Sequence, residues 1–329
     1  MEFLFTDWLG TPLWFWLSFV AIVITLTAFD LGVLHKEDRE MGVKESLILS
    51  AFYISVALAF GLWVWLERGP DLGMKYFTGF FIEKALSIDN VFVISLIFGF
   101  FAIPRAYQYR ALLWGILAVI VLRGLMIAAG AALVQEFYWT LYIFAAFLIV
   151  TGIRMLWAAD HEPDIGNNAL VRWLSRHMRI TKELHGPRFF VRQLDSKTGK
   201  LAIAATPLFL ALVVINIADL VFAVDSVPAI FAITTDTFVV YTSNIMAILG
   251  LRALYFALAA MVHRFHYLKY ALALVLVFIG AKIFIGDFLV EGGKVPPAFS
   301  LGVTFALILG GVLWSLWKTR GEEKGGAAS

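Results

Sequence analysis

Two short segments of this 329-residue sequence carry acidic residues at the same spacing. Glu83 and Asp89 are six residues apart in IEKALSIDNVFVI. Asp219 and Asp225 are six residues apart in ADLVFAVDSVPAI. Carboxylates, with neutral amide, hydroxyl and carbonyl oxygens, are the ligands that hard cations such as Mg²⁺, Ca²⁺ and Mn²⁺ prefer. The residues that we predict to form a metal site are Glu83, Asp89, Asn90, Asn216, Asp219, Val224, Asp225 and Ser226.

The six-residue spacing limits how each acidic pair can act on a cation. Residues six apart on a regular α-helix lie about 9 Å apart along the axis and about 120° apart around it. Two arrangements are open: a broken helix that brings both acids to one ion, or successive stations along a route. Pro228 favours a break, because it cannot donate to the Val224 carbonyl and an unwound carbonyl can coordinate a cation. A simple packing kink is the structural alternative. Asn216, three residues before Asp219, would add an oxygen on the same helix face.

The composition indicates which solvent surrounds these segments. Hydrophobic residues make up 61% of the chain and charged residues only 15%. Soluble domains average roughly 45–50% apolar and about 25% charged residues, so most of this apolar surface must face a bilayer. We predict an all-α polytopic membrane protein in which residues 1–329 form a single transmembrane domain. Apolar runs predict about nine transmembrane helices, at 12–34, 45–66, 76–100, 109–134, 137–157, 206–233, 238–262, 268–288 and 298–317.

Basic residues are distributed unevenly between the two ends of these spans. One side of the membrane receives most lysines and arginines, whereas the other receives only Arg68, Lys75 and Lys294. The positive-inside rule therefore places the C-terminus and the 158–204 loop in the cytoplasm and the N-terminus outside.

The 158–204 loop is predicted to contain structure outside the membrane. Its segment ALVRWLSRHMR mixes apolar residues with arginines and predicts an interfacial helix on anionic lipid headgroups. The segment FFVRQLDSKTGKLAI predicts a small hairpin that turns at 196–199. A solvated linker without a function of its own is the alternative.

The two acidic segments belong to a longer internal repeat of three spans each. An odd number of helices per unit means that the second unit enters the membrane from the opposite face. Such an inverted repeat (spans 3–5 and 6–8) is typical of secondary transporters, whose sites lie near the midplane between the repeats. The matched pairs are Glu83 and Asp219, Asp89 and Asp225, Asn90 and Ser226, Arg123 and Arg252, Gly152 and Gly280, and Arg154 and Lys282.

Further ionisable residues fall inside the predicted spans, among them Asp30, Arg123 and Arg252. Each costs about 2.5–3.5 kcal/mol on insertion scales and usually faces a partner or a water-filled cavity. For the arginines, simple neutralisation of nearby carboxylates is the structural alternative to a functional role. The chain has no Cys, and its histidines fall in loops or at span ends, so a route for Zn²⁺ or Cu⁺ through soft ligands is poorly supported.

Catalysis and nucleic-acid binding find no support in the sequence. The motifs HExxH and GxGD are absent, so we expect no enzymatic activity. A net charge of only +2 gives no reason to expect a nucleic-acid partner.

Three long motifs resemble the signatures of a known family. EKALSIDNVFV, DLVFAVDSVPAIFAITTD and SNIMAILGLRALYF are similar to segments of the TerC membrane proteins, and the chain looks closest to their Alx-type branch. The resemblance implies export of Mn²⁺ across the inner membrane of a bacterium, without a permanently bound cofactor. It implies that Glu83, Asp89, Asp219 and Asp225 line the route. The Alx-type pattern leads us to expect Glu where this chain has Asn216, which bears on metal affinity, selectivity and proton coupling.

Two other functions stay open. The protein could export another small solute, such as Ca²⁺ or a basic amino acid. It could instead supply metal to exported proteins, or assist them, without being a transporter.

Overall fold

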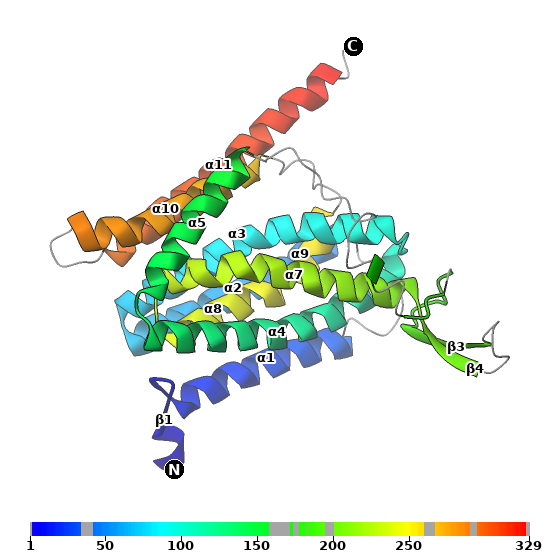
Figure 1. The fold of residues 1–329 in the computed structure, drawn as a ribbon, viewed down its shortest axis with the longest axis horizontal. Coiled ribbons are helices and arrows are strands. Elements are labelled where there is room, and N and C mark those ends of the chain that lie inside the picture. Colours follow the sequence, from blue (N-terminus) through cyan, green and yellow to red (C-terminus); the bar gives the residue numbers. More distant parts are fainter. Residues whose placement is uncertain are drawn as a thin grey trace.

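The computed structural model describes residues 2–33, 42–157, 172–173, 178–181, 183–194, 201–259, 267–289 and 295–326, and most of these residues are helical (Figure 1). A short helix, η1 (Glu2–Phe5), and the paired strands β1 (Asp7–Trp8) and β2 (Thr11–Pro12) precede the first long helix. The long helices are α1 (Leu13–Val33), α2 (Val43–Arg68), α3 (Pro70–Phe100), α4 (Arg105–Glu136), α5 (Thr140–Trp157), α7 (Pro207–Phe231), α8 (Thr237–Leu249), α9 (Leu251–Leu258), α10 (Leu268–Leu289) and α11 (Pro297–Gly326).

Seven described helices are long and apolar enough to cross a membrane: α1, α2, α4, α5, α7, α10 and α11. An eighth span is formed if α8 and α9 are taken together. The remaining long helix, α3, is not among them because three charged residues, Glu83, Lys84 and Asp89, lie close together along it. The described helices therefore support a polytopic membrane protein with seven to eight spans, and α3 as a ninth span stays a prediction.

The predicted span 238–262 is not one straight helix. It is interrupted at Gly250, where α8 ends and α9 begins with a bend of 40°. A methyl group at this position would lie 3.0 Å from Nζ of Lys84 and 3.1 Å from Cβ of Tyr53. The close approach of α3 and α2 explains why the smallest residue occupies the break.

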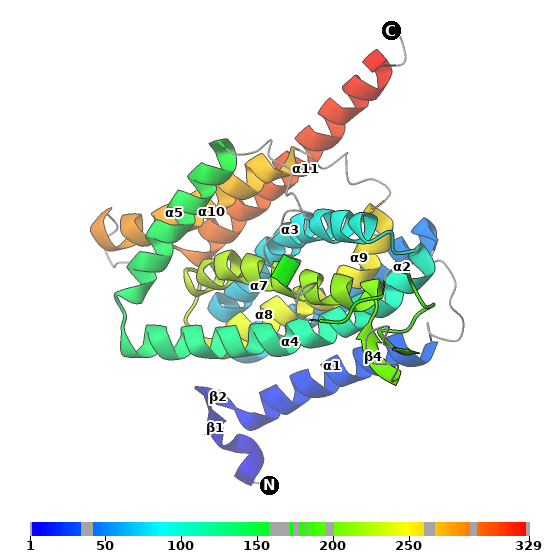
Figure 2. The ribbon, with the colours of Figure 1, turned by 45° about the vertical axis from the view of Figure 1, so that its right-hand side comes forward.

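The helices form two groups that both views separate (Figures 1 and 2). One group runs side by side and contains α1, α2, α3, α4, α7 and α8. The other contains α5, α10 and α11, which are inclined to the first group. Contacts of α3 with α11 and of α7 with α5 join the two groups. The helices that carry the predicted acids thus lie where the two groups meet.

Close packing between α5 and α10 depends on two glycines that match in the sequence. A methyl group on Gly152 would lie 2.7 Å from the carbonyl oxygen of Ala273. A methyl group on Gly280 would lie 2.5 Å from the carbonyl oxygen of Ala145. Each glycine therefore faces the backbone seven residues before the other, which is the relation that a two-fold axis between the helices generates. This agrees with the predicted inverted repeat, which stays a prediction for the chain as a whole.

Between α5 and α7 the structure describes a two-stranded sheet. The strands β3 (Phe190–Leu194) and β4 (Leu201–Ala205) pair antiparallel, with Phe190 opposite Ala205 and Leu194 opposite Leu201. The predicted hairpin is thereby confirmed in its strands, while its turn at 196–199 lies outside the described residues. Most of the predicted interfacial helix, ALVRWLSRHMR, also lies outside them.

Candidate cation site

Arg123 is the centre of a charged cluster buried inside the first group of helices. It lies on α4 and is 1% exposed. It donates to both oxygens of Asp219 on α7, over 3.0 Å from Nε and 2.9 Å from Nη2. Its Nη1 pairs with Oε1 of Glu83 on α3. Both carboxylates are buried away from water, so their negative charge is compensated by this guanidinium instead of by solvation.

Neutral polar groups surround the same guanidinium. Asn244 on α8 donates to Oε2 of Glu83 over 3.0 Å and accepts from Arg123 over 3.2 Å. Ser226 accepts from Arg123 over 3.2 Å, and Asn90 on α3 donates to the α7 carboxylate over 3.4 Å. The cluster thus joins α3, α4, α7 and α8. Four of the residues predicted from sequence lie together in it: Glu83, Asn90, Asp219 and Ser226.

Asp225 and Val224 lie apart from this cluster. Asp225 is partly buried, and its polar neighbours are Thr151 and Arg154 on α5. The Val224 side chain is 47% exposed on the surface of α7. Asp225 therefore forms a second polar region at the junction of the two helix groups.

Asn216 has an acceptor oxygen without a donor. Its Nδ2 donates to the Leu212 carbonyl over 2.8 Å, whereas its Oδ1 is buried and has no hydrogen-bond partner among the described residues. Such an orphan acceptor costs about 1–3 kcal/mol. A bound cation or a water molecule would relieve that cost, since either can satisfy a carbonyl-type oxygen.

Both α3 and α7 are continuous through their acidic residues. The helix α7 contains Pro228 and continues to Phe231, so the expected break at Pro228 is wrong. The proline lies within the last turn, where loss of one donor interrupts little of the hydrogen-bonded ladder. Each acidic pair therefore lies on a continuous helix. Of the two arrangements considered, this one favours successive stations along a route over two ligands of one ion. The side chain of Asp89 lies outside the described part of the structure.

The second buried arginine has a different partner. Arg252 on α9 pairs with Asp30 on α1, and its guanidinium lies over the Tyr109 ring at 4.3 Å from the centroid. Its Nε and Nη1 are buried and find no hydrogen-bond acceptor among the described residues. Arg252 thus joins the second predicted repeat to a helix outside both repeats.

Sequence reasoning missed Asn244 and the position of Lys84. Asn244 ends a short polar run, Thr242, Ser243 and Asn244, about two turns before Arg252, and that run was the available signal. The Nζ of Lys84 donates to the Ala247 carbonyl over 3.1 Å, beside the break between α8 and α9. Nothing in the sequence signals that contact, because it depends on where α8 ends.

No three His, Asp or Glu side chains converge on one point among the described residues, a set that lacks the Asp89 side chain. The cluster therefore offers a cation two carboxylates and neutral oxygens, with Arg123 already between them. A divalent ion could use these carboxylates only if the guanidinium moved.

A family model described as "Integral membrane protein TerC family" matches residues 68–323, which is more than half of the chain. The chain belongs to the TerC family. The TerC match covers every element of the Arg123 cluster. It begins after α1, so Asp30 lies outside the matched residues.

Bacterial relatives match over nearly the whole chain. An "Uncharacterized membrane protein" of Rickettsia bellii (strain RML369-C) is 46% identical over 301 residues, which is 92% of this chain and 96% of the relative. "Uncharacterized membrane protein STKORF319" of Myxococcus xanthus is 44% identical over 305 residues, which is 93% of this chain and 92% of the relative. "Putative membrane-bound redox modulator Alx" of Salmonella typhi is 41% identical over 324 residues, which is 96% of this chain and 97% of the relative. No solved structure matches the chain.

Proposed function

We propose that this TerC family protein exports a divalent cation from the bacterial cytoplasm, with Mn²⁺ as its preferred cargo, and catalyses no reaction. The observation that carries the proposal is that Glu83 and Asp219, from two helices, converge on the buried guanidinium of Arg123. Isolated carboxylates are expensive at this depth, and two that share a site repel one another. Their proximity is useful if a cation of higher charge can replace the guanidinium for part of a transport cycle.

Arg123 and a cargo ion exclude one another in this proposal, because both would occupy the space between the same carboxylates. Loading requires the guanidinium to move away, and release lets it return. Neither carboxylate is then left uncompensated in the membrane interior, a state that costs several kcal/mol. The arginine thereby favours release by restoring the cargo-free arrangement.

The proposed route includes stations beyond the cluster. Asp225 lies six residues along α7 from Asp219, beside Thr151 and Arg154. Asp89 is its proposed counterpart on α3, and the unsatisfied oxygen of Asn216 is the proposed neutral ligand on the other side of Asp219. Mn²⁺ takes about six hard oxygen ligands, so a mixture of carboxylates and neutral oxygens suits it. The N-terminus is proposed to lie outside and the C-terminus in the cytoplasm, in the inner membrane.

Cellular manganese content tests the proposal. A host that lacks its own manganese exporters should contain less manganese when it expresses the wild-type chain. Asp219→Asn and Asp225→Asn each keep the side-chain volume and remove one charge, so both should abolish this effect. The control is Asp71→Asn, at an acid whose side chain is 59% exposed, which should behave as wild type. Normal membrane levels of both site variants together with wild-type manganese content would place the cation site elsewhere.

Flux into proteoliposomes separates the cargo alternatives. Mn²⁺ and Ca²⁺ are supplied separately, and a lumenal pH indicator reports any proton movement. Uptake of Ca²⁺ in preference to Mn²⁺ would correct the cargo. Absence of flux for both ions would favour a membrane factor that supplies metal to exported proteins, or assists them, and such a factor should co-purify with translocation components.

The name of the Alx relatives supports a second candidate, modulation of the redox state at the membrane. These 329 residues contain no Cys, so thiol–disulfide exchange by this chain is excluded. A redox effect of this protein would then follow from the metal content that it controls. An unchanged redox response in Asp219→Asn cells that have lost manganese export would separate the two functions.

A further inference from the structure

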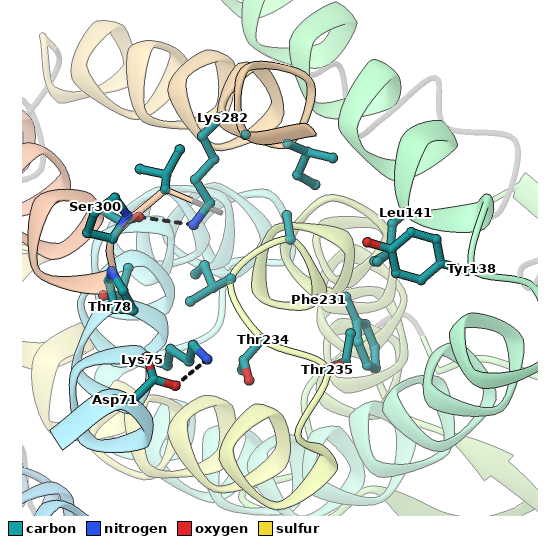
Figure 3. Close-up of a pocket in the computed structure, with 17 residues that line it drawn as sticks. Asp71, Lys75, Thr78, Tyr138, Leu141, Phe231, Thr234, Thr235, Lys282 and Ser300 are labelled. Atoms are coloured by element: carbon teal, nitrogen blue, oxygen red, sulfur yellow. Dashed lines mark hydrogen bonds and ion pairs between the residues drawn. The ribbon is translucent and has the colours of Figure 1, made fainter. Parts of the chain in front are cut away.

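A cavity of about 390 Å³ lies away from the Arg123 cluster, at the end of the bundle where α3 begins and α7 ends. Helices α3, α10 and α11 surround it, together with the 231–235 segment and the start of α5 (Figure 3). Two lysines, Lys75 and Lys282, direct their ammonium groups into this space from different helices (Figure 3). Asp71 is the one acidic residue among the described lining residues, so the two ammonium groups outnumber the carboxylates and the cavity is a poor vestibule for a divalent cargo.

Lys282 has no carboxylate partner among the described side chains. It is partly buried on α10, and its Nζ donates to Oγ of Ser300 on α11 over 3.0 Å. A hydroxyl satisfies one donor of the ammonium but does not neutralise its charge. A bound anion would offset the desolvation of an ammonium in this position.

Lys75 can serve the same anion. Its pairing with Asp71 is an exposed contact of 2.5 Å four residues apart on one helix, and the Asp71 side chain is 59% exposed. Such surface pairs stabilise by only about 0.3–0.5 kcal/mol, so an anion in the cavity can compete for the ammonium.

Two hydroxyls at the cavity have their protons available. Oγ of Ser300 accepts from Lys282, and Oγ1 of Thr234 accepts a hydrogen bond from the Asp236 N–H over 3.2 Å. Neither hydroxyl donates to an acceptor among the described residues. Two ammonium groups and two hydroxyl protons match an anion with several acceptor oxygens.

A run of exposed aromatic residues includes one that lines the cavity. Phe137, Tyr138 and Trp139 follow one another before α5, with exposed fractions of 50%, 61% and 58%. Tyr and Trp are enriched at membrane–water interfaces, so this run favours a position of the cavity at the depth of the lipid headgroups. Tyr138 itself lines the cavity. A phosphate group at this depth can come from solution or from a lipid.

We propose that this cavity binds a phosphate group through Lys282, Lys75, Ser300 and Thr234, supplied either as free phosphate or as the headgroup of an anionic lipid. The proposal does not depend on cation export, because no residue of the Arg123 cluster takes part. It assigns the cavity a ligand of the opposite charge to the proposed cargo.

The test is binding to the full-length protein, without any transport step. Calorimetric titration of detergent-solubilised protein with inorganic phosphate, at constant ionic strength set with chloride, measures binding of free phosphate. Native mass spectrometry after exposure to phosphatidylglycerol or phosphatidylcholine measures binding of lipid headgroups. Lys282→Met should raise the apparent Kd for the bound source about tenfold to a hundredfold, because a charge-assisted hydrogen bond is lost. Ser300→Ala should raise it about fivefold.

Matched variants separate binding from folding. Lys282→Arg keeps the charge and should retain most of the binding. Lys318→Met removes a lysine at the far end of α11 and should change neither phosphate binding nor lipid binding. Phosphate binding that Lys282→Met abolishes assigns the cavity to free phosphate, and selective retention of phosphatidylglycerol that the same change abolishes assigns it to lipid. Absence of binding in both arms, or binding that persists in well-folded Lys282→Met, overturns the proposal.

Discussion

Arg123 and Arg252 match one another in the predicted repeat, and each is 1% exposed, but they hold different parts of the molecule together. Arg123 makes hydrogen bonds through all three of its nitrogens and contacts helices of both predicted repeats. Arg252 pairs with Asp30 of α1 and an aromatic ring, and part of its guanidinium finds no acceptor among the described residues. The difference shows that matching sequence positions need not have matching roles. One arginine is central to both repeats, and the other anchors a helix outside them.

The largest effect should follow from Arg123→Met. Removing one partner of a buried ion pair costs about 3–5 kcal/mol because the remaining charges stay buried without compensation. Here two carboxylates would be stranded. We expect a marked fall in the thermal midpoint in detergent and in the yield of monodisperse protein. The triple variant Glu83→Gln, Asp219→Asn, Arg123→Met removes the stranded charges and should recover most of the stability. A single variant as stable as wild type would contradict the central role of Arg123.

A smaller loss is expected for Asp30→Asn. The change leaves Arg252 charged, but the Tyr109 ring still faces the guanidinium and the Asp30 side chain is 11% exposed. A loss of about 1.5–3 kcal/mol is expected, in line with hydrogen bonds to charged groups. A double-mutant cycle with Arg252→Gln would measure the coupling by thermal unfolding. Manganese export should persist in Asp30→Asn, whereas its loss would give both arginines a role in the proposed route.

The glycines of α5 and α10 test whether the two predicted repeats are related by a two-fold axis. Gly152→Ala and Gly280→Ala each place a methyl group against the backbone of the partner helix, and overpacking costs about 1–3 kcal/mol. The two losses in thermal stability should be similar if a two-fold axis relates the helices. Gly310→Ala on α11, where a methyl group meets nothing within 4 Å, is the control and should not destabilise. A large loss at one glycine alone would argue against the axis.

The smallest effect is expected for Asp71→Asn, which breaks an exposed ion pair with Lys75. A surface pair four residues apart contributes about 0.3–0.5 kcal/mol. Thermal stability should therefore stay close to that of wild type. This small change is the reference against which the losses expected for the buried Arg123 and Asp30 variants are compared. A loss as large as that of Asp30→Asn would mean that this end of α3 is held by its charges.

The sequence predicted most helix positions because each apolar run is bounded by charged residues, glycine or proline, as at α2 between Lys44 and Arg68. It also predicted that Glu83 and Asp219 are related. It could not predict that they share Arg123, because ionisable groups in different spans meet through tertiary packing that no local pattern records. The break was expected at Pro228 and occurs at Gly250, since a proline in the last turn of a helix disturbs little. A glycine between two apolar turns is a weak signal until its neighbours are known.

Lys84 and the break at Gly250 bear on how α3 and α8 can move relative to one another. The ammonium of Lys84 donates to the carbonyl of Ala247 near the end of α8, in a part of the bundle where Ala247 is fully buried. A displacement of α3 along α8 by more than the reach of a hydrogen bond breaks this contact and leaves a buried carbonyl oxygen without this donor, which costs about 1–3 kcal/mol. The hydrogen bond therefore adds a specific contact to an interface that is already closely packed, as where Gly79 of α3 faces Ser243 of α8. This contact favours one register of α3 along α8 over registers that differ from it by a small shift, so relative motion of the two helices has to begin by breaking it.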